Sequence, residues 1–187
     1  MKLAVFFPGV GYTNDMPLLY YSRKIASNLG YDFLKINYRD LGPEMLSDEE
    51  KIKKGLVLSY RAVERRLREV DLSKYDRIVF ISKSIGTVIA AKYDERNSME
   101  VDHIYFTPVE QTFESITKKD PLVFYSNADP FTESSFIEEK CRDLGYKMYM
   151  IDQGNHSLET QDTIEDIDRM KFIMTVVKNY LKKEISE

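Results

Sequence analysis

Short apolar runs alternate with longer amphipathic stretches along the whole chain, and this pattern constrains the fold more than any other feature of the sequence. A continuous apolar run, such as the first one ended by Pro8-Gly9, is typical of a strand buried on both faces. Strands are expected at Leu3–Phe7, Tyr31–Tyr38, Ile78–Ile81, His103–Thr107, Leu122–Tyr125 and Lys147–Ile151. Strands that alternate with helices predict an α/β fold with a mostly parallel six-stranded sheet covered on both faces. Ligand chemistry in such a sheet is expected where the strands end.

Helices with one apolar face are expected between these strands. The first should have Pro17 in its first turn and Gly30 just after its end. Ser47 is the expected N-cap of a long helix, which has a buried stripe from Ile52 to Val70 and a Lys/Arg-rich outer face that we interpret as solvated surface. The expected inner faces are Leu18, Tyr21, Ile25 and Leu29 in the first helix, and Ile167, Met170, Met174, Val177 and Leu181 in the last.

Length and composition exclude several functional classes. The 187 residues predict one domain, residues 1–187, large enough to fold without a metal or a disulfide. The 27 basic and 31 acidic side chains give a net charge of −4, which argues against nucleic-acid binding. Cys141 is the only cysteine, which excludes an intrachain disulfide and a Cys-rich zinc site. No apolar run approaches the length of a membrane span, and Met1–Pro8 is too short for the core of a signal peptide, so we expect a cytoplasmic protein.

A serine-rich turn follows the third expected strand. The segment Ser82-Lys83-Ser84-Ile85-Gly86 connects this strand directly to a helix of small residues. It resembles the nucleophile elbow of the α/β-hydrolase superfamily, Gly-x-Ser-x-Gly, with Ser82 in place of the first glycine. Small flanking residues let the strand and helix backbones approach closely, and the helix N-terminus stabilises negative charge on a substrate. The other interpretation is that Ser84 only caps the helix, because serine is a favoured N-cap.

An acidic residue and a histidine follow two later strands in the order that this superfamily uses, which is serine, then acid, then histidine. Asp129 and His156 each lie just past an expected strand. The alternative for Asp129 is a turn-forming role ahead of Pro130. Asp152 is the rival acid, but its position at the very end of a strand makes it the poorer match. His103 is the other histidine of the chain and is expected to be structural.

The resemblance covers most of the chain and implies a role for each of these residues. Ser84 would attack a carbonyl carbon, His156 would take its proton, and Asp129 would fix the imidazole tautomer and stabilise its charged form. The backbone N–H groups of Ile85 and Val10 would form the oxyanion hole. The resemblance also implies a sheet order of 2-1-3-4-5-6, with no metal and no organic cofactor.

The function implied is that of a small lidless serine hydrolase, which cleaves a small-molecule ester, thioester or activated amide through an acyl-enzyme. Only about a dozen residues lie between Pro108 and Pro121, where larger members of the superfamily insert a lid. An acyltransferase with the same three residues is a variant of this hypothesis. Tyr12, Phe113 and Phe131 are expected either to line the site or to pack in the core. A monomer or a homodimer is expected.

Two other functions remain open at this point. A chain with this fold and no turnover would be a binding or regulatory module, because fold does not determine function. A nucleotide or flavin at the end of the first strand would use Gly9-Val10-Gly11, although Asn14 stands where the dinucleotide motif has its third glycine. Cys141 shares an apolar helical stripe with Phe136, Ile137 and Leu144, so it is interpreted as a core residue and not as a nucleophile.

Overall fold

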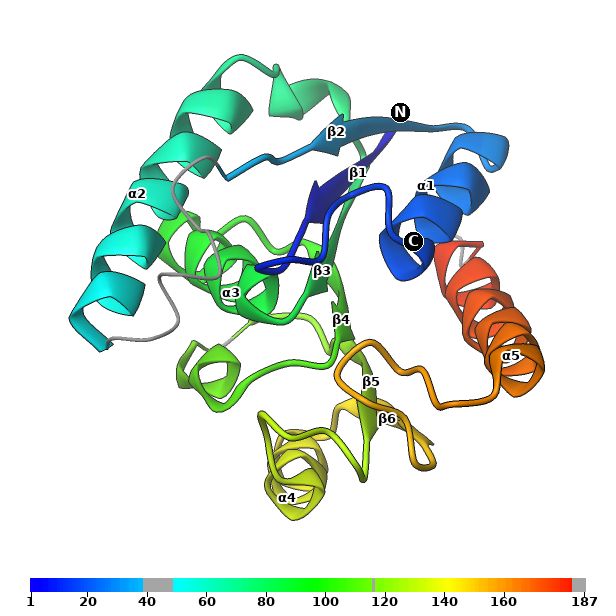
Figure 1. Ribbon diagram of the computed structural model, residues 1–187. Coiled ribbons are helices and arrows are strands. Elements are labelled where there is room, and N and C mark those ends of the chain that lie inside the picture. Colours follow the sequence, from blue (N-terminus) through cyan, green and yellow to red (C-terminus); the bar gives the residue numbers. More distant parts are fainter. Residues whose placement is uncertain (39–48, 116, 183–187) are drawn as a thin grey trace.

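In the computed structural model, which describes residues 1–38, 49–115 and 117–182, strands and helices alternate as expected (Figure 1). The strands are β1 Lys2–Phe7, β2 Tyr31–Lys35, β3 Arg77–Lys83, β4 Asp102–Phe106, β5 Leu122–Ser126 and β6 Lys147–Ile151. The α-helices are α1 Pro17–Asn28, α2 Glu49–Arg68, α3 Ile85–Asn97, α4 Ser134–Leu144 and α5 Thr163–Leu181, and the 3-10 helices are η2 Leu72–Lys74 and η3 Glu110–Glu114. The predicted N-cap Ser47 lies outside the described residues. None of the described helices is long and apolar enough to cross a membrane.

The described strands form one six-stranded sheet in which every pair is parallel, in the order β2-β1-β3-β4-β5-β6. This is the order that the resemblance implies. The inner strands β1, β3, β4 and β5 have neighbours on both sides and are almost wholly buried, which explains why their sequences are apolar throughout. The edge strands are less covered, and Phe33 of β2 and Met150 of β6 face solvent.

Helices cover both faces of the sheet. Figure 1 shows α1 and α5 on one face, and α2 and α3 on the other. The side chains of each strand alternate between the two faces, so that Ile81 joins the core beneath α1 and α5, whereas Phe80 joins the core beneath α2 and α3. Because the strands are parallel, the turns that follow β1, β3, β5 and β6 all lie at one edge of the sheet.

Three side chains expected on apolar helix faces are exposed, so those expectations were wrong. Tyr21 of α1 is 48% exposed, Ile167 of α5 is 59% exposed and Leu144 of α4 is 38% exposed. The buried face of α1 consists of Leu18, Leu19, Ser22 and Ala26. Ser22 is tolerated there because its hydroxyl donates a hydrogen bond to the Leu18 carbonyl (2.6 Å). In α5 the fully buried residues begin only at Ile173, a turn and a half beyond Ile167.

The connection between β4 and β5 contains η3, which lies against α3. A hydrogen bond of 2.6 Å joins the hydroxyls of Thr112 in η3 and Thr87 in α3. Both threonines are buried, and the Thr87 hydroxyl also lies 2.6 Å from the Ser84 carbonyl. This connection therefore supports the turn between β3 and α3 from the side of α3.

Candidate active site

The backbone of Ser84 makes the turn between β3 and α3 in a conformation that is strained for a residue with a side chain. Its φ is 54° and its ψ is −127°. Such a conformation persists only where the surrounding structure imposes it. Here the Ser84 N–H donates to the Phe106 carbonyl (3.0 Å), and the Ser84 carbonyl accepts from the N–H of Thr87 (2.8 Å). The Ser84 side chain makes no capping hydrogen bond, so the interpretation of this residue as a simple N-cap is wrong.

Two glycines allow the first strand exit to approach this turn. A Cβ on Gly86 would lie 2.4 Å from the Phe7 carbonyl oxygen and 2.5 Å from that of Pro8, so no other residue fits there without a backbone shift. A Cβ on Gly9 would lie 3.2 Å from the Cβ of Ser84. The start of α3 is therefore packed directly against the backbone that leaves β1.

Three side chains from three strand exits form a continuous hydrogen-bonded chain at this edge of the sheet. The Ser84 Oγ lies 2.7 Å from the His156 Nε2, and the His156 Nδ1 lies 2.7 Å from the Asp129 Oδ2. The side chain of Asp129 is 4% exposed and that of His156 is 20% exposed. An imidazole in this position can accept the serine proton on one nitrogen while the carboxylate holds the proton on the other.

Asp129, and not Asp152, is the acid that contacts the histidine. Asp129 also forms the turn that was its alternative role, because its Oδ1 accepts a hydrogen bond from the Phe131 N–H (2.9 Å). One carboxylate oxygen thus fixes the local backbone and leaves the other for His156. The rival Asp152 is exposed, and its Oδ1 instead accepts from the Asn127 side chain (2.7 Å).

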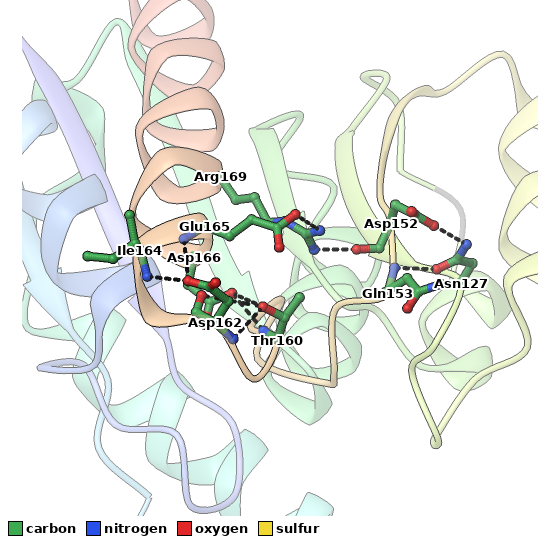
Figure 2. A network of polar contacts seen from close by, with 9 residues as sticks. All are labelled: Asn127, Asp152, Gln153, Thr160, Asp162, Ile164, Glu165, Asp166 and Arg169. Atoms are coloured by element: carbon green, nitrogen blue, oxygen red, sulfur yellow. Dashed lines mark hydrogen bonds and ion pairs between the residues drawn. The ribbon is translucent and has the colours of Figure 1, made fainter.

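The loop that carries His156 is held at both ends by polar contacts, as Figure 2 shows for the segment between β6 and α5. Asn127 bridges the exits of β5 and β6, because its amide also accepts from the Gln153 N–H (2.7 Å). Arg169 of α5 donates to the Asp152 carbonyl and to Glu165.

At the other end of the loop, where α5 begins, Asp162 caps the helix, and the backbone N–H and hydroxyl of Thr160 donate to the Asp166 carboxylate. The His156 carbonyl itself accepts from the Thr107 hydroxyl (3.1 Å).

A hollow of about 730 Å³ lies beside this loop, but neither Ser84 nor His156 lines it. Its walls are Ala128 after β5 and polar side chains of the loop and of the first turns of α5, of which Asp152, Gln153, Thr160, Asp162, Glu165 and Arg169 are drawn in Figure 2. This hollow therefore does not include the hydrogen-bonded chain of Ser84, His156 and Asp129.

Burial governs the ionisation of the site. It lowers the pKa of the His156 imidazole below its ordinary value; hydrogen bonding to Asp129 acts in the opposite direction, and the nearby Lys83 ammonium acts in the same direction as burial. Burial also lowers the pKa of Lys83 to about 7, although the charge of Asp129 raises it. His156 is thus held in the neutral form that can act as a base.

Lys83 is the residue of this site that the sequence interpretation missed. Its side chain is 1% exposed, directly between the two serines of the turn. The available signal was a cation two residues after the apolar run Ile78–Ile81, in a place where a charged residue is rarely buried without a reason.

Of the two residues expected to form the oxyanion hole, Ile85 follows Ser84 directly, and Val10 follows Gly9, where a Cβ would lie 3.2 Å from the Cβ of Ser84. Ile85 is the first residue of α3, so its N–H has no acceptor within the helix. Val10 lies in the loop after β1, which a hydrogen bond from the Gly9 N–H to the Tyr12 carbonyl closes (3.0 Å). The same loop is the dinucleotide alternative, but α1 begins only at Pro17, so no helix N-terminus follows the glycines directly.

The remaining candidates are distributed between the site and the core. The Phe131 ring is 62% exposed and lies 4.6 Å from the His156 ring, whereas Tyr12 is buried and Phe113 packs against Phe136. Cys141 is fully buried in the core beneath α4, as predicted, and burial raises the pKa of its thiol to about 12.

His103 is fully buried and bonds to Asp94 of α3 (2.9 Å), as expected of a structural residue. Within the described part of the chain, no group of three or more His, Cys, Asp and Glu side chains is arranged to hold a metal ion.

Solved structures with the same architecture are numerous, although the sequences are distant. The chain superimposes on the protein Est1E from Butyrivibrio proteoclasticus, solved with ferulic acid bound, with a TM-score of 0.71 and 12% identity over 97% of this chain and 88% of that one. An α/β serine hydrolase without a lid from Xanthomonas campestris gives a TM-score of 0.70 and 15% identity, over 98% and 84%. An esterase from Pyrococcus furiosus superimposes with a TM-score of 0.69 and 14% identity, over 97% of this chain and 82% of that one. No protein-family model and no curated protein matches the sequence significantly.

Proposed function

We propose that this chain, which has the fold of the α/β hydrolases, is a serine hydrolase that cleaves an acyl bond through an acyl-enzyme. The observation that carries the proposal is the Ser84–His156–Asp129 chain, with two contacts of 2.7 Å, built on a strained turn between a strand and a helix. A serine oxygen bonded to a neutral imidazole, which is itself bonded to a buried carboxylate, is the arrangement that activates a serine as a nucleophile.

The proposed reaction has two halves. Ser84 Oγ attacks the carbonyl carbon while His156 Nε2 takes the hydroxyl proton, and the N–H groups of Ile85 and Val10 stabilise the oxyanion. Collapse of the tetrahedral intermediate transfers that proton from His156 to the leaving group and gives the acyl-enzyme. Water then attacks the carbonyl of the acyl-enzyme while His156 takes a proton from it. The second tetrahedral intermediate collapses to release the carboxylic acid, and His156 returns that proton to Ser84 Oγ. Asp129 remains ionised and stabilises the imidazolium in both halves.

The substrate class that we propose is a small acyl ester, with thioesters and activated amides as chemically related alternatives. The β4–β5 connection is short, and the exposed Phe131 ring beside His156 offers an apolar surface to an acyl or alcohol group. The similarity to a hydrolase without a lid and to a protein solved with ferulic acid supports a small, accessible substrate. We further propose that residues 1–187 act as one domain without a lid.

The experiment that tests this function is hydrolysis of p-nitrophenyl acetate, with Ser84→Ala and the matched control Ser157→Ala. Ser157 lies in the same loop as His156, but its hydroxyl takes no part in the chain to Asp129. We expect turnover in the wild type and in Ser157→Ala, and its loss in folded Ser84→Ala. Equal activity in Ser84→Ala would exclude Ser84 as the nucleophile, and no activity in any of the three would favour a binding module.

A further inference from the structure

Phe131 is an exposed aromatic residue beside the proposed base. It is 62% exposed, and the centroid of its ring lies 4.6 Å from that of the His156 ring, with an angle of 55° between the two ring planes. Among the residues that the structure describes, Phe131 belongs to none of the apolar clusters of the core, and His156 is the only ring that it contacts. Packing within the fold therefore does not account for a phenylalanine at this position.

The backbone that carries this ring is anchored, although the ring itself faces solvent. The Phe131 N–H donates to the Asp129 Oδ1 (2.9 Å), and the other oxygen of that carboxylate is bonded to His156 (2.7 Å). The next residue, Thr132, is buried. One carboxylate thus holds both the imidazole and the residue whose ring lies against it.

The proposed mechanism sends each substituent of the substrate carbonyl carbon in a different direction. The carbonyl oxygen points to the N–H groups of Ile85 and Val10. The leaving group lies beside His156, because Nε2 takes the proton of Ser84 and then delivers it to the leaving oxygen. The acyl chain takes the remaining direction. A side chain in contact with the imidazole is therefore on the leaving-group side of the reacting carbon.

We propose that Phe131 is a specificity-determining residue that contacts the alcohol portion of the substrate, and that this alcohol carries a flat apolar group such as an aromatic ring. The inference rests on the proposed function and deepens it, because it states which part of the ester the site recognises. An aromatic alcohol can stack on the exposed ring or meet it edge to face, and the contact removes apolar surface from water. The methyl group of a methyl ester is too small to cover the ring.

The same ring should select the acceptor in the second half of the reaction. Water or an alcohol that attacks the acyl-enzyme enters from the side on which the leaving group departed, because this step is the reverse of the first. If an alcohol attacks, its oxygen bonds to the acyl carbon and His156 takes the hydroxyl proton. Collapse of the intermediate breaks the bond to Ser84 Oγ, which receives that proton, and a new ester is released. An alcohol that covers Phe131 should therefore compete better with water.

The first test measures kcat/KM for esters in which either the alcohol or the acyl group is varied. Benzyl acetate and methyl acetate differ only in the alcohol, whereas methyl butyrate and methyl acetate differ only in the acyl chain. In Phe131→Ala we expect the preference for benzyl over methyl acetate to fall on the order of tenfold, and the preference between the two acyl chains to stay as in the wild type. Phe131→Leu keeps apolar bulk without the ring and should give an intermediate value. The matched control is Phe33→Ala, which should keep both preferences, since Phe33 is also exposed but lies on β2.

The second test measures how the acetyl-enzyme formed from p-nitrophenyl acetate partitions between water and an added alcohol. In the wild type, benzyl alcohol should yield more new ester, relative to the acetate released, than methanol at the same concentration. This excess should fall in Phe131→Ala and persist in Phe33→Ala. The partition is independent of the rate at which the acetyl-enzyme forms, so a general loss of activity in a variant does not change it.

Three results would overturn the inference: a wild type that does not prefer benzyl acetate, a Phe131→Ala variant that keeps that preference, or a change in the acyl preference instead. An equal decrease for all the esters would also overturn it, because Phe131 would then only cover His156. Failure of the proposed function has a different signature. The wild type would then hydrolyse none of the esters, and a fluorophosphonate, whose leaving group is fluoride and not an alcohol, would not modify Ser84.

Discussion

Ser84 combines a reactive oxygen with a backbone conformation that most residues avoid. With φ at 54° and ψ at −127°, any side chain at this position is held against its own backbone preference. The neighbouring contacts, from the Ser84 N–H to Phe106 and from Thr87 to the Ser84 carbonyl, impose this geometry. The Ser84 hydroxyl does not cap the helix and instead lies 2.7 Å from the His156 Nε2.

Replacing Ser84 by glycine should therefore stabilise the fold relative to replacement by alanine. Both variants lack the hydroxyl, but only glycine adopts a positive φ without steric penalty. We expect Ser84→Gly to exceed Ser84→Ala by on the order of 1 kcal/mol in the free energy of unfolding, measured by urea denaturation. A more stable Ser84→Ala would mean that the turn relaxes when the serine is removed.

Asp129 should be required for the rate of ester hydrolysis and not for substrate binding. Asp129→Asn preserves the size of the side chain but no longer enforces the tautomer that presents a basic Nε2 to Ser84. Loss of this role in a Ser-His-Asp site reduces kcat by about 10⁴. We expect a decrease of this order in ester hydrolysis, against little change in Asp152→Asn, whose carboxylate contacts Asn127. The reverse pattern would identify Asp152 as the functional acid.

At the scale of secondary-structure elements, the site depends on how closely α3 approaches the end of β1. Gly86 is the contact point, with the carbonyls of Phe7 and Pro8 at 2.4 and 2.5 Å from any Cβ placed there. These atoms are backbone and cannot rotate away as a side chain would.

Gly86→Ala should consequently weaken both the fold and the site. The added methyl group must push α3 away from β1, and overpacking of this kind costs about 1–3 kcal/mol. We expect a lower midpoint of urea unfolding together with slower modification of Ser84, because the loop that carries Val10 shifts with β1. Wild-type stability and reactivity in this variant would show that the close approach is dispensable.

The element pattern of the chain made much of this architecture predictable. Continuous apolar runs indicate strands buried on both faces, and chain order then assigns Ser84, Asp129 and His156 to exits at the same edge. Helix faces were less well predicted, as Tyr21 and Ile167 show, because a 3.6-residue period does not reveal where a neighbouring helix ends.

Lys83 was missed for a related reason. The elbow pattern specifies the serine and its small neighbours and treats the intervening position as free. The burial of Lys83 results from Gly9 and Tyr12, which belong to another strand exit about 70 residues earlier in the sequence. Only the three-dimensional structure brings those residues together.

At the scale of the whole molecule, buried histidine links stability to pH. His103 is fully buried against Asp94, and burial is the main reason why its pKa lies below the ordinary value. The unfolded chain therefore binds a proton in a range where the folded protein does not. The stabilisation is complete above the ordinary histidine pKa of about 6.5 and is lost as the pH falls through the lower pKa of the folded state.

Global stability should thus decrease between pH 7.5 and pH 5.5, and less so in His103→Gln. Each unit between the folded and unfolded pKa corresponds to about 1.4 kcal/mol. The pKa of His156 is also lowered, so His156 makes stability depend on pH in the same direction. The variant His156→Gln is therefore compared as well, and it should keep the part of the pH dependence that is due to His103. Urea unfolding at the two pH values measures the difference. An identical pH dependence in His103→Gln and the wild type would mean that His103 is readily protonated in the folded state.

The most direct test of the central claim is intact-protein mass spectrometry after exposure to a fluorophosphonate, with Ser84→Ala and His156→Ala measured alongside the wild type. An activated serine predicts a single adduct on Ser84, absent in Ser84→Ala and formed much more slowly in His156→Ala. A folded wild-type protein that gains no adduct, or one that is modified equally fast without His156, would contradict the claim that this hydrogen-bonded chain activates Ser84.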